Sequence, residues 1–285
     1  MTDIRPVPGT LYVVATPLGH REDVTLRALR VLSEVALVAC EDTRRTARLL
    51  RPLGIRTPTT SYFEHNQRFK GARILEVLRG GRDVALVSDA GTPGISDPGH
   101  RLVRDARAEG IPVLPVPGPS AVVTALSVSG FPGDRFRFVG FLPRRPHPRQ
   151  QALEELAQGR ETLVVFEAPT RVLGCLLQME EVLGDREAFL CREATKLHEE
   201  YVRGRLSELR RRIETHGPPR GEFVLVVSGA EGHEVRETET PEVVFRRLVG
   251  QGRSRREAVK ETARLLGLKA RDVYQRVLED TPRGS

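Results

Sequence analysis

Residues 84–99 read VALVSDAGTPGISDPG, an apolar run followed by a loop rich in glycine and proline. The run Val84–Ser88 has the length and composition of a buried strand. The loop Asp89–Gly99 combines three glycines, two prolines, two hydroxyl side chains and two carboxylates. Loops of this length in compact domains are often functional, although the same residue types are common in plain surface turns. The stretch therefore predicts a strand that leads into a rigid loop able to wrap a neutral or cationic ligand.

Similar apolar runs recur through the chain and alternate with segments of helical periodicity. This alternation predicts βα units around a mainly parallel sheet, and so an α/β fold. In the first part of the chain the other predicted strands are Leu11–Thr16, Val35–Cys40 and Val113–Val116. A second series is expected near Thr162–Phe166, Ala188–Arg192, Tyr201–Gly204 and Phe223–Ser228.

The arrangement of these runs predicts two α/β domains and a small helical tail. We expect an N-terminal domain over residues 1–142, a Pro/Arg linker over 143–149, a C-terminal domain over 150–235 and a tail over 236–285. The tail's helical patterns are Pro241–Val249, Ser254–Leu265 and Ala270–Leu278. Ser254 followed by Glu257 is a capping-box pattern, and Gly267 is suited to end the helix.

Composition limits the classes of protein to consider. The 285 residues carry 45 basic and 38 acidic side chains, and arginine supplies nearly all of the positive charge. The planar guanidinium suits phosphates and stacked bases, although arginine-biased codon usage would also explain the excess. No apolar signal core or membrane span is present in the sequence. The three cysteines, Cys40, Cys175 and Cys191, lie in apolar runs, which favours buried thiols over disulfides or a metal site and predicts a cytoplasmic protein.

The segments that follow the predicted strands are the places where ligands bind in a parallel sheet. They include Thr16–His20, Glu41–Arg44 and Pro117–Ala121, besides the loop at 89–99. None of them has the G-x-G-x-x-G or G-x-x-x-x-G-K-[ST] pattern. This argues against a dinucleotide or a nucleoside triphosphate as the ligand.

Eight ordered motifs carry a specific resemblance between Gly9 and Ala230. They are ATPLGHREDVTLRAL (15–29), ACEDTRRTARLL (39–50), VALVSDAGTPGISDPG (84–99), VPGPSAVVTAL (116–126), GFLP (140–143), FEAPTR (166–171), CREATKLHEE (191–200) and GEFVLVV (221–227). In this order they resemble the tetrapyrrole-methylase superfamily, and within it the 16S ribosomal RNA (cytidine 2′-O)-methyltransferases.

The resemblance implies a two-domain fold, usually homodimeric, with S-adenosylmethionine in a cleft between the domains. It implies 16S rRNA in the small ribosomal subunit as the substrate. Because the sequence contains no apolar stretch long enough for a membrane span, no membrane association is expected. Carried over motif by motif, the cofactor-binding residues would be Pro17, Leu18, Asp89, Thr92, Ile95, Ser120, Ala121, Phe166, Glu167, Ala194 and Val224. A sulfonium carries positive charge that carboxylates and carbonyls can face, and the adenine needs apolar walls.

The reaction implied is an in-line attack of a ribose 2′-oxygen on an activated methyl group. A hydroxyl is a weak nucleophile until its proton is withdrawn, so a base is expected within hydrogen-bond reach. The candidates are Glu41, Asp42, Glu167, Lys196, Glu199 and Glu200. The last three are also compatible with a solvated charge cluster, and Asp42 before Thr43 is also compatible with a helix N-cap. The sequence leaves the base unassigned.

Clustered arginines are the candidates for contact with RNA phosphates. The expected track consists of Arg44, Arg45, Arg48, Arg144, Arg145 and Arg149, with Arg253, Arg255 and Arg256 at a helix start in the tail. Basic side chains are not favoured at a helix N-terminus, so an external anion is one explanation for the tail cluster and plain solvation is another. His65 and Asn66 lie in a polar loop that could also contact RNA.

Two other functions remain compatible with the sequence. One is a C-methyltransferase of the same fold that acts on an acidic tetrapyrrole, against which the arginine clusters and the helical tail argue. The other is a non-catalytic RNA-binding assembly factor that has kept the cofactor fold. Measuring S-adenosylmethionine binding by calorimetry would separate the second case.

Overall fold

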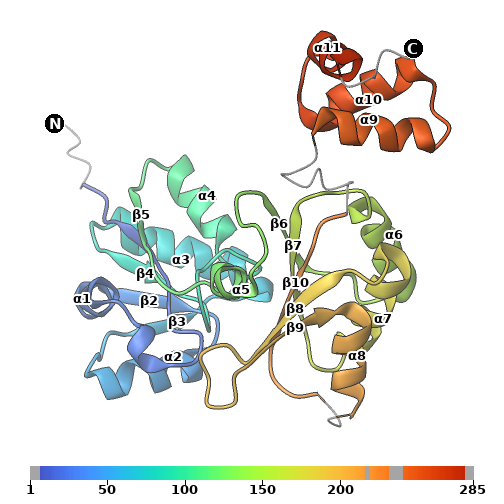
Figure 1. The fold of residues 1–285 in the computed structure, drawn as a ribbon. Helices are drawn as coiled ribbons and strands as arrows, with labels where there is room; N and C mark the ends of the chain where they lie inside the picture. Colours follow the sequence, from blue (N-terminus) through green and yellow to red (C-terminus); the bar gives the residue numbers. More distant parts are fainter. Residues whose placement is uncertain (1–6, 216–218, 231–239, 280–285) are drawn as a thin grey trace, which may run out of the picture. The chain divides into compact units, whose positions relative to one another are not determined.

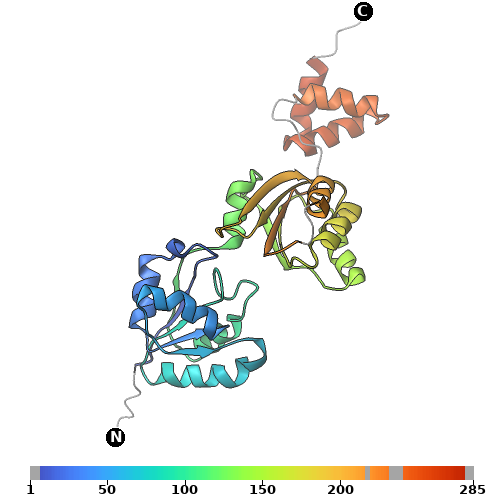
Figure 2. The ribbon, with the colours of Figure 1, turned by 90° about the horizontal axis from the view of Figure 1, so that it is seen from below.

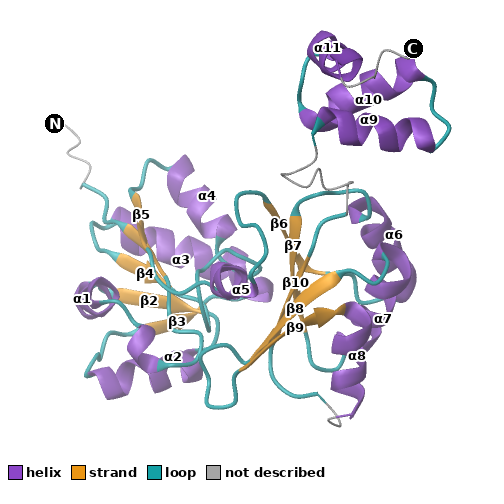
Figure 3. Ribbon diagram, viewed as in Figure 1, coloured by secondary structure: helices purple, strands orange, loops and turns teal. Residues whose placement is uncertain are grey.

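The structure of the chain is a computed structural model that describes residues 7–215, 219–230 and 240–279. The chain divides into two compact units, Met1–Ala230 and Glu231–Ser285. The larger unit contains two five-stranded sheets, and the smaller one is helical in its described part (Figures 1 and 3).

The first sheet is parallel throughout, as the alternating sequence pattern predicted. Its strands are β1 (Leu11–Val14), β2 (Leu37–Cys40), β3 (Thr59–Ser61), β4 (Val84–Leu86) and β5 (Val113–Val116), in the order β3-β2-β4-β1-β5. Four of these strands match predicted runs. The edge strand β3 was not predicted, because its residues Thr-Thr-Ser give no apolar signal.

Helices cover both faces of this sheet (Figure 2). They are α1 (Leu26–Glu34), α2 (Thr43–Leu50), α3 (Gln67–Arg79) and α4 (His100–Ala108), with short 3₁₀ turns η1 (Arg21–Asp23), η2 (Arg51–Leu53) and η3 (Glu64–Asn66). The next helix, α5 (Ala121–Ser129), follows β5. Leu32 of α1 and Leu50 of α2 pack on one face. Ile74 of α3 and Leu102 of α4 pack on the other. The strands are therefore buried from both sides, which explains their continuous apolar runs.

The second sheet differs from the expectation of a mainly parallel sheet. It consists of β6 (Phe136–Phe141), β7 (Thr162–Glu167), β8 (Glu187–Arg192), β9 (Glu200–Arg205) and β10 (Phe223–Val227), in the order β6-β7-β10-β8-β9. Only β6 and β7 pair in parallel, and the other neighbours are antiparallel. The prediction was wrong here because a short loop joins β8 to β9, and such a loop connects antiparallel neighbours only.

The two faces of the second sheet pack against different helices. One face carries α6 (Pro146–Leu156), α7 (Val172–Leu183) and α8 (Leu206–Thr215). The other packs against α5, whose Val122, Ala125 and Leu126 contact Val164 and Val224. Because α5 directly follows the last strand of the first sheet, it joins the two sheets into one unit.

The expected linker at Pro143–Arg149 does not separate the two sheets. The first strand of the second sheet, β6, precedes it. From Pro146 onward the segment forms the first turn of α6, a position that tolerates proline because the missing N–H would have no helical partner. The proposed boundary between residues 235 and 236 lies outside the described residues.

The smaller unit has its own apolar core. Its helices are α9 (Pro241–Gly250), α10 (Arg255–Leu266) and α11 (Ala270–Glu279). Val244, Phe245 and Leu248 of α9 pack against Ala258 of α10. The predicted capping box is confirmed, with both reciprocal hydrogen bonds between Ser254 and Glu257, and Gly267 ends α10 in the left-handed conformation.

Two further expectations can be compared with the structure. All three cysteines are free and buried, as predicted. None of the described helices combines the length and the apolar character needed to cross a bilayer.

Candidate active site

A cavity of about 350 Å³ lies between the two halves of the larger unit, where the loops of the first sheet face the second sheet. It collects loops that are far apart in the sequence, because the carboxyl ends of parallel strands meet at one edge of a sheet. Cys40 pairs with Ser61 and Val14 with Val116, so the segments after β1, β2 and β5 leave the sheet together. Most of the predicted cofactor-binding residues line this cavity: Leu18, Asp89, Thr92, Ile95, Ser120, Ala121, Phe166, Glu167, Ala194 and Val224.

Hydrogen bonds hold the loop at 89–99 against its neighbours. Thr16 and Gly91 form an antiparallel bridge with two backbone hydrogen bonds of 2.9 Å. The Thr92 hydroxyl donates to the carbonyl oxygen of Pro119 at 3.1 Å. Gly91 has φ of +78°, and a Cβ there would lie 3.2 Å from Cδ2 of Leu18. Glycine therefore provides both the backbone conformation and the space that this part of the cavity requires.

The N-terminus of α5 also faces the cavity. Ser120, Ala121 and Val122 all contribute to the lining, and the Ser120 side chain makes no capping hydrogen bond to the helix. The first N–H groups of a helix have no partner within the helix and carry partial positive charge. This end of the cavity is suited to an anionic group of a ligand.

Besides Glu167, four acidic residues line the cavity, and the lining also contains Arg45. Glu41, Asp89 and Asp97 come from the first half and Glu222 from the second, while Nη1 of Arg45 pairs with Oδ2 of Asp89 at 3.0 Å. Burial, followed by the charge of Glu41, raises the pKa of Asp97 to about 6. Burial, followed by the charge of Asp89, raises the pKa of Glu41. The cavity is therefore acidic and partly shielded from water.

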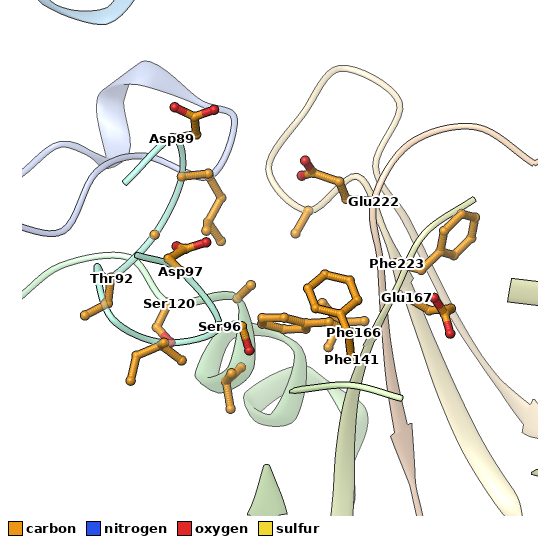
Figure 4. A pocket seen from close by; sticks show the side chains of 18 of the residues that line it. Asp89, Thr92, Ser96, Asp97, Ser120, Phe141, Phe166, Glu167, Glu222 and Phe223 are labelled. Atoms are coloured by element: carbon orange, nitrogen blue, oxygen red, sulfur yellow. The ribbon is translucent and has the colours of Figure 1, made fainter. Parts of the chain in front are cut away.

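Aromatic rings from the second half form an apolar wall opposite the carboxylates of the first half (Figure 4). Phe141 and Phe166 both line the cavity and meet edge to face, with 5.7 Å between their ring centroids (Figure 4). Phe138 packs edge to face on the other side of Phe166, at 5.0 Å. The guanidinium of Arg171 lies 5.9 Å from the centroid of Phe141. Such a wall suits the planar part of a ligand.

Of the candidate bases, Glu167 is turned away from the cavity (Figure 4). Its side chain is fully buried and forms an ion pair with Arg171. It also accepts a hydrogen bond from the backbone N–H of Ala168 at 2.8 Å. Its carboxylate is thus engaged in holding the segment after β7.

Other candidates lie outside the cavity lining, although each is described. Oδ1 of Asp42 accepts a hydrogen bond from the backbone N–H of Arg44 at 2.7 Å. Asp42 is thus the N-cap of α2, which was the alternative interpretation of this residue. Oε2 of Glu199 accepts hydrogen bonds from the Tyr201 hydroxyl and from a backbone N–H. Glu200 pairs with Arg192 and Arg212.

Lys196 and Pro17 are also outside the lining. Nζ of Lys196 pairs with Glu193 at 2.8 Å and with Glu222 at 3.1 Å. The close approach of Lys196 to Gly19, beside Pro17, brings the loop after β8 against the loop after β1. Among the sequence candidates for a base, Glu41 therefore combines a place in the lining with a carboxylate outside any ion pair in the described part of the chain.

The structure adds cavity residues that sequence reasoning did not select. Asp97, Phe141 and Glu222 lay within the quoted motifs, but only the approach of the second sheet to the loop at 89–99 brings them together. Arg45, expected to bind RNA, lines the cavity and pairs with Asp89.

The arginine track is only partly exposed. Arg44 and Arg48 on α2 are exposed, as are Arg144 and Arg145 before α6. Arg149 is buried, and its Nε donates to Oε1 of Gln178 at 2.5 Å, so the expectation that it contacts RNA was wrong. It lies on the inner face of α6 with Leu153 and Leu156. In the smaller unit, Arg253, Arg255 and Arg256 are exposed around the start of α10.

Comparison with known proteins agrees with this architecture. Residues 10–210 match the model of the tetrapyrrole (corrin/porphyrin) methylases. The chain is 45% identical over 272 residues to "Ribosomal RNA small subunit methyltransferase I" of Halalkalibacterium halodurans, with 93% of each chain covered. It is 48% identical over 223 residues to the protein of the same name from Thermotoga maritima, covering 78% of this chain and 100% of that one.

Solved structures with the same fold are more distant in sequence. The uroporphyrin-III-C-methyltransferase of Thermus thermophilus is 25% identical with a TM-score of 0.56, over 76% of this chain and 94% of that chain. A cobalt precorrin-4 methyltransferase of cobalamin biosynthesis is 20% identical with a TM-score of 0.58, again over 76% and 94%. The second likeness shows the fold alone.

Proposed function

The chain belongs to the tetrapyrrole (corrin/porphyrin) methylase family, as its motifs predicted, and from this premise we propose that it methylates ribosomal RNA. The reaction is transfer of a methyl group from S-adenosylmethionine to the ribose 2′-hydroxyl of a cytidine in 16S rRNA of the small ribosomal subunit. One observation carries the proposal: a relative named as a small-subunit rRNA methyltransferase is 45% identical over 93% of the chain, a span longer than the family match at 10–210.

The cavity is compatible with S-adenosylmethionine in size and in chemistry. Its volume of about 350 Å³ lies within the range of small-molecule sites. The carboxylates suit a sulfonium, the Phe141 and Phe166 wall suits an adenine, and the N-terminus of α5 suits a carboxylate. The residues that would hold the cofactor are Leu18, Asp89, Thr92, Ile95, Ser120, Ala121, Phe166, Ala194 and Val224, with Pro17 and the backbone of Glu167 beside them. When bound, the cofactor supplies an electrophilic methyl group.

The chain's own contribution is orientation and proton removal. The Thr16–Gly91 bridge holds the loops of the first wall together, and the packing of α5 on the second sheet fixes the second wall relative to the first. Fixed walls hold the reacting groups in line, and such orientation lowers the barrier substantially. The acidic side chains in the lining can accept the hydroxyl proton.

The RNA would be bound by arginines at the edge of the cavity and in the tail. Arg44 lies in the first turn of α2, which directly follows Glu41 of the lining. Arg144 and Arg145 follow Phe141 of the lining closely in the chain. These exposed side chains could contact phosphates on either side of the target ribose, while Arg253, Arg255 and Arg256 dock a separate part of the RNA.

A tetrapyrrole C-methyltransferase is the less favoured function. The enzymes of that type that share the fold are 20% and 25% identical to the chain, against 45% and 48% for the rRNA methyltransferases. We also propose that two copies associate, since Leu114 on the edge strand β5 and Val123 and Val128 on α5 are exposed apolar side chains. Light scattering of the purified protein tests this association.

The function is tested by incubating the protein with methyl-labelled S-adenosylmethionine and small subunits that lack the modification. Labelled 2′-O-methylcytidine at one position of the 16S rRNA is the expected result. Label in a tetrapyrrole but not in the subunits would favour the alternative enzyme. Cofactor binding without transfer to either substrate would favour a non-catalytic assembly factor.

A further inference from the structure

A group of exposed side chains outside the cavity lies where the chain leaves the edge strand β3. Ser61, the last residue of β3, pairs with Cys40 of β2, and the backbone N–H of Tyr62 donates to the carbonyl oxygen of Cys40 at 2.7 Å. The residue after Cys40 is Glu41, which lines the cavity. The segment from Phe63 onward therefore leaves the sheet at the same edge as the cavity loops, beside the segment that contains Glu41.

Two aromatic rings of this segment are exposed. Phe63, directly before η3, is 36% exposed. Phe69, in the first turn of α3, is 60% exposed, the largest value among the ten phenylalanines of the chain. The buried residues of α3 include Ile74 and Leu78, so the helical period turns Phe69 away from the core. Single exposed apolar residues are common on surfaces, whereas two exposed rings at the edge of a cavity are typical of a binding surface.

The charges around the rings favour an anionic partner. Between residues 63 and 73 the sequence has three basic side chains, Arg68, Lys70 and Arg73, and one acidic side chain, Glu64. The guanidinium of Arg73 lies 4.2 Å from the centroid of the Phe69 ring. Exposed rings and guanidinium planes together complement RNA, which offers flat bases on a chain of phosphates.

Hydrogen bonds fix the loop that carries Phe63. Oδ1 of Asn66 accepts the backbone N–H of Phe63 at 2.8 Å, and Nδ2 of Asn66 donates to the carbonyl oxygen of Ser61 at 3.2 Å. The exposed ring of His65 meets Phe63 edge to face, with 6.3 Å between the centroids. The amide of Asn66 is thus engaged within the loop. A ring held in this way loses little conformational freedom when a ligand stacks on it.

We infer that Phe63 and Phe69 are stacking platforms for unpaired bases that flank the target cytidine. This inference rests on the proposed function. A ribose can reach a methyl donor inside a cavity of about 350 Å³ only if its nucleotide leaves the stack of neighbouring bases. The bases on either side then lose a stacking partner, and exposed aromatic rings beside the cavity replace it.

Stacking differs from phosphate binding in its dependence on salt. Loss of a phosphate contact lowers the slope of log affinity against log salt, because fewer counterions are released on binding. Loss of a stacked ring removes no charge and should lower the affinity while keeping the slope. The salt slope therefore distinguishes the role of the two rings from that of the exposed arginines.

The test measures binding of small subunits that lack the modification at several salt concentrations. Phe63→Leu and Phe69→Leu should each weaken binding by about fivefold or more at the parent's salt slope. Phe69→Tyr should keep most of the affinity, because its ring also stacks. The control Phe136→Leu changes a ring that is 39% exposed, at the opposite end of β6 from the cavity residue Phe141, and should match the parent. Calorimetry should give the same affinity for S-adenosylmethionine in all variants.

Ultraviolet crosslinking of the bound subunits identifies what lies against the rings. We expect crosslinks from residues 63–69 to 16S rRNA next to the methylated cytidine, and crosslinks to a ribosomal protein alone would overturn the inference. A parent that transfers no methyl group to subunits would overturn the proposed function and this inference with it. A methylating parent whose leucine variants bind subunits equally well, or bind weakly with a lower salt slope, would overturn the inference alone.

Discussion

Single residues in the cavity have roles that the surrounding geometry makes testable. Gly91 is one, because it combines a left-handed backbone with close contact to Leu18. Gly110 has a similar φ of +72° but no heavy atom within 4 Å of where its Cβ would be. Substituting Gly91 and Gly110 in turn separates the effect of backbone strain from the effect of a side chain in the cavity.

Gly91→Val should weaken S-adenosylmethionine binding by roughly tenfold or more, about 1.4 kcal/mol. Gly110→Val should bind the cofactor normally. Both variants should lose about 1–2 kcal/mol of folding stability, the cost of a left-handed residue with a Cβ. Calorimetric titration and urea unfolding measure the two effects, and equal cofactor affinity in the two variants would contradict the site assignment.

The Arg171–Glu167 pair predicts a stability effect. Arg171→Met would leave a fully buried carboxylate without its cation. Breaking a buried pair in this way typically costs about 3–5 kcal/mol. The control Arg30→Met breaks the exposed Arg30–Glu34 pair and should cost less than about 1 kcal/mol. The urea unfolding midpoints of the two variants measure these losses of stability. A similarly small loss in both variants would mean that the buried pair contributes little to stability.

At the scale of elements, the loops after the strands and the helix α5 determine where the chemistry takes place. The loops that follow the parallel strands of the first sheet lie at one edge of it, and α5 packs onto the second sheet. Exposed arginines follow residues of the cavity lining closely in the chain: Arg44 follows Glu41, and Arg144 and Arg145 follow Phe141. At the opposite edge of the first sheet lie Arg79, Arg82 and Arg107, also exposed.

This contrast provides a matched test of RNA binding. Replacing Arg44, Arg144 and Arg145 together by alanine should weaken subunit binding and lower the slope of log affinity against log salt by about 0.7–0.9 for each lost phosphate contact. The control triple replaces Arg79, Arg82 and Arg107, removes the same charge and should keep the parent's slope. Equal slopes for the two triples would place the phosphate contacts elsewhere.

At the scale of the whole molecule, the chain contains two units with separate cores. The core of the smaller unit is formed by its own helices α9 and α10. The family match ends at residue 210, well before this unit begins. The cavity is lined entirely by residues of the larger unit.

Truncation after Gly232 should therefore leave a folded protein with normal affinity for S-adenosylmethionine. We expect it to methylate subunits poorly, mainly through a higher KM for subunits, because Arg253, Arg255 and Arg256 are removed. Replacing those three arginines by alanine in the full-length chain should raise the KM for subunits to a similar value. If truncation lowers the melting temperature and the cofactor affinity together, the tail stabilises the larger unit instead.

The sequence by itself determined most elements of the first half, except the edge strand β3, and it indicated the loop that lines the cavity. Buried parallel strands and capped helices leave signals along the chain, since apolar runs and residues such as Ser254 act through near neighbours. The loop at 89–99 was recognisable for the same reason, because its glycines and prolines dictate local backbone shape. Eight ordered motifs then sufficed to indicate the family.

Only the tertiary structure decided how the strands of the second sheet pair and which residues line the cavity. Strand direction depends on contacts between distant residues, such as Phe223 with Glu167, which no local pattern reports. The same holds for Arg149, whose burial follows from the helix face that α6 turns to the core. Asp97 and Glu222 are more than a hundred residues apart in the chain, and they share a cavity because folding brings the second sheet to the edge of the first.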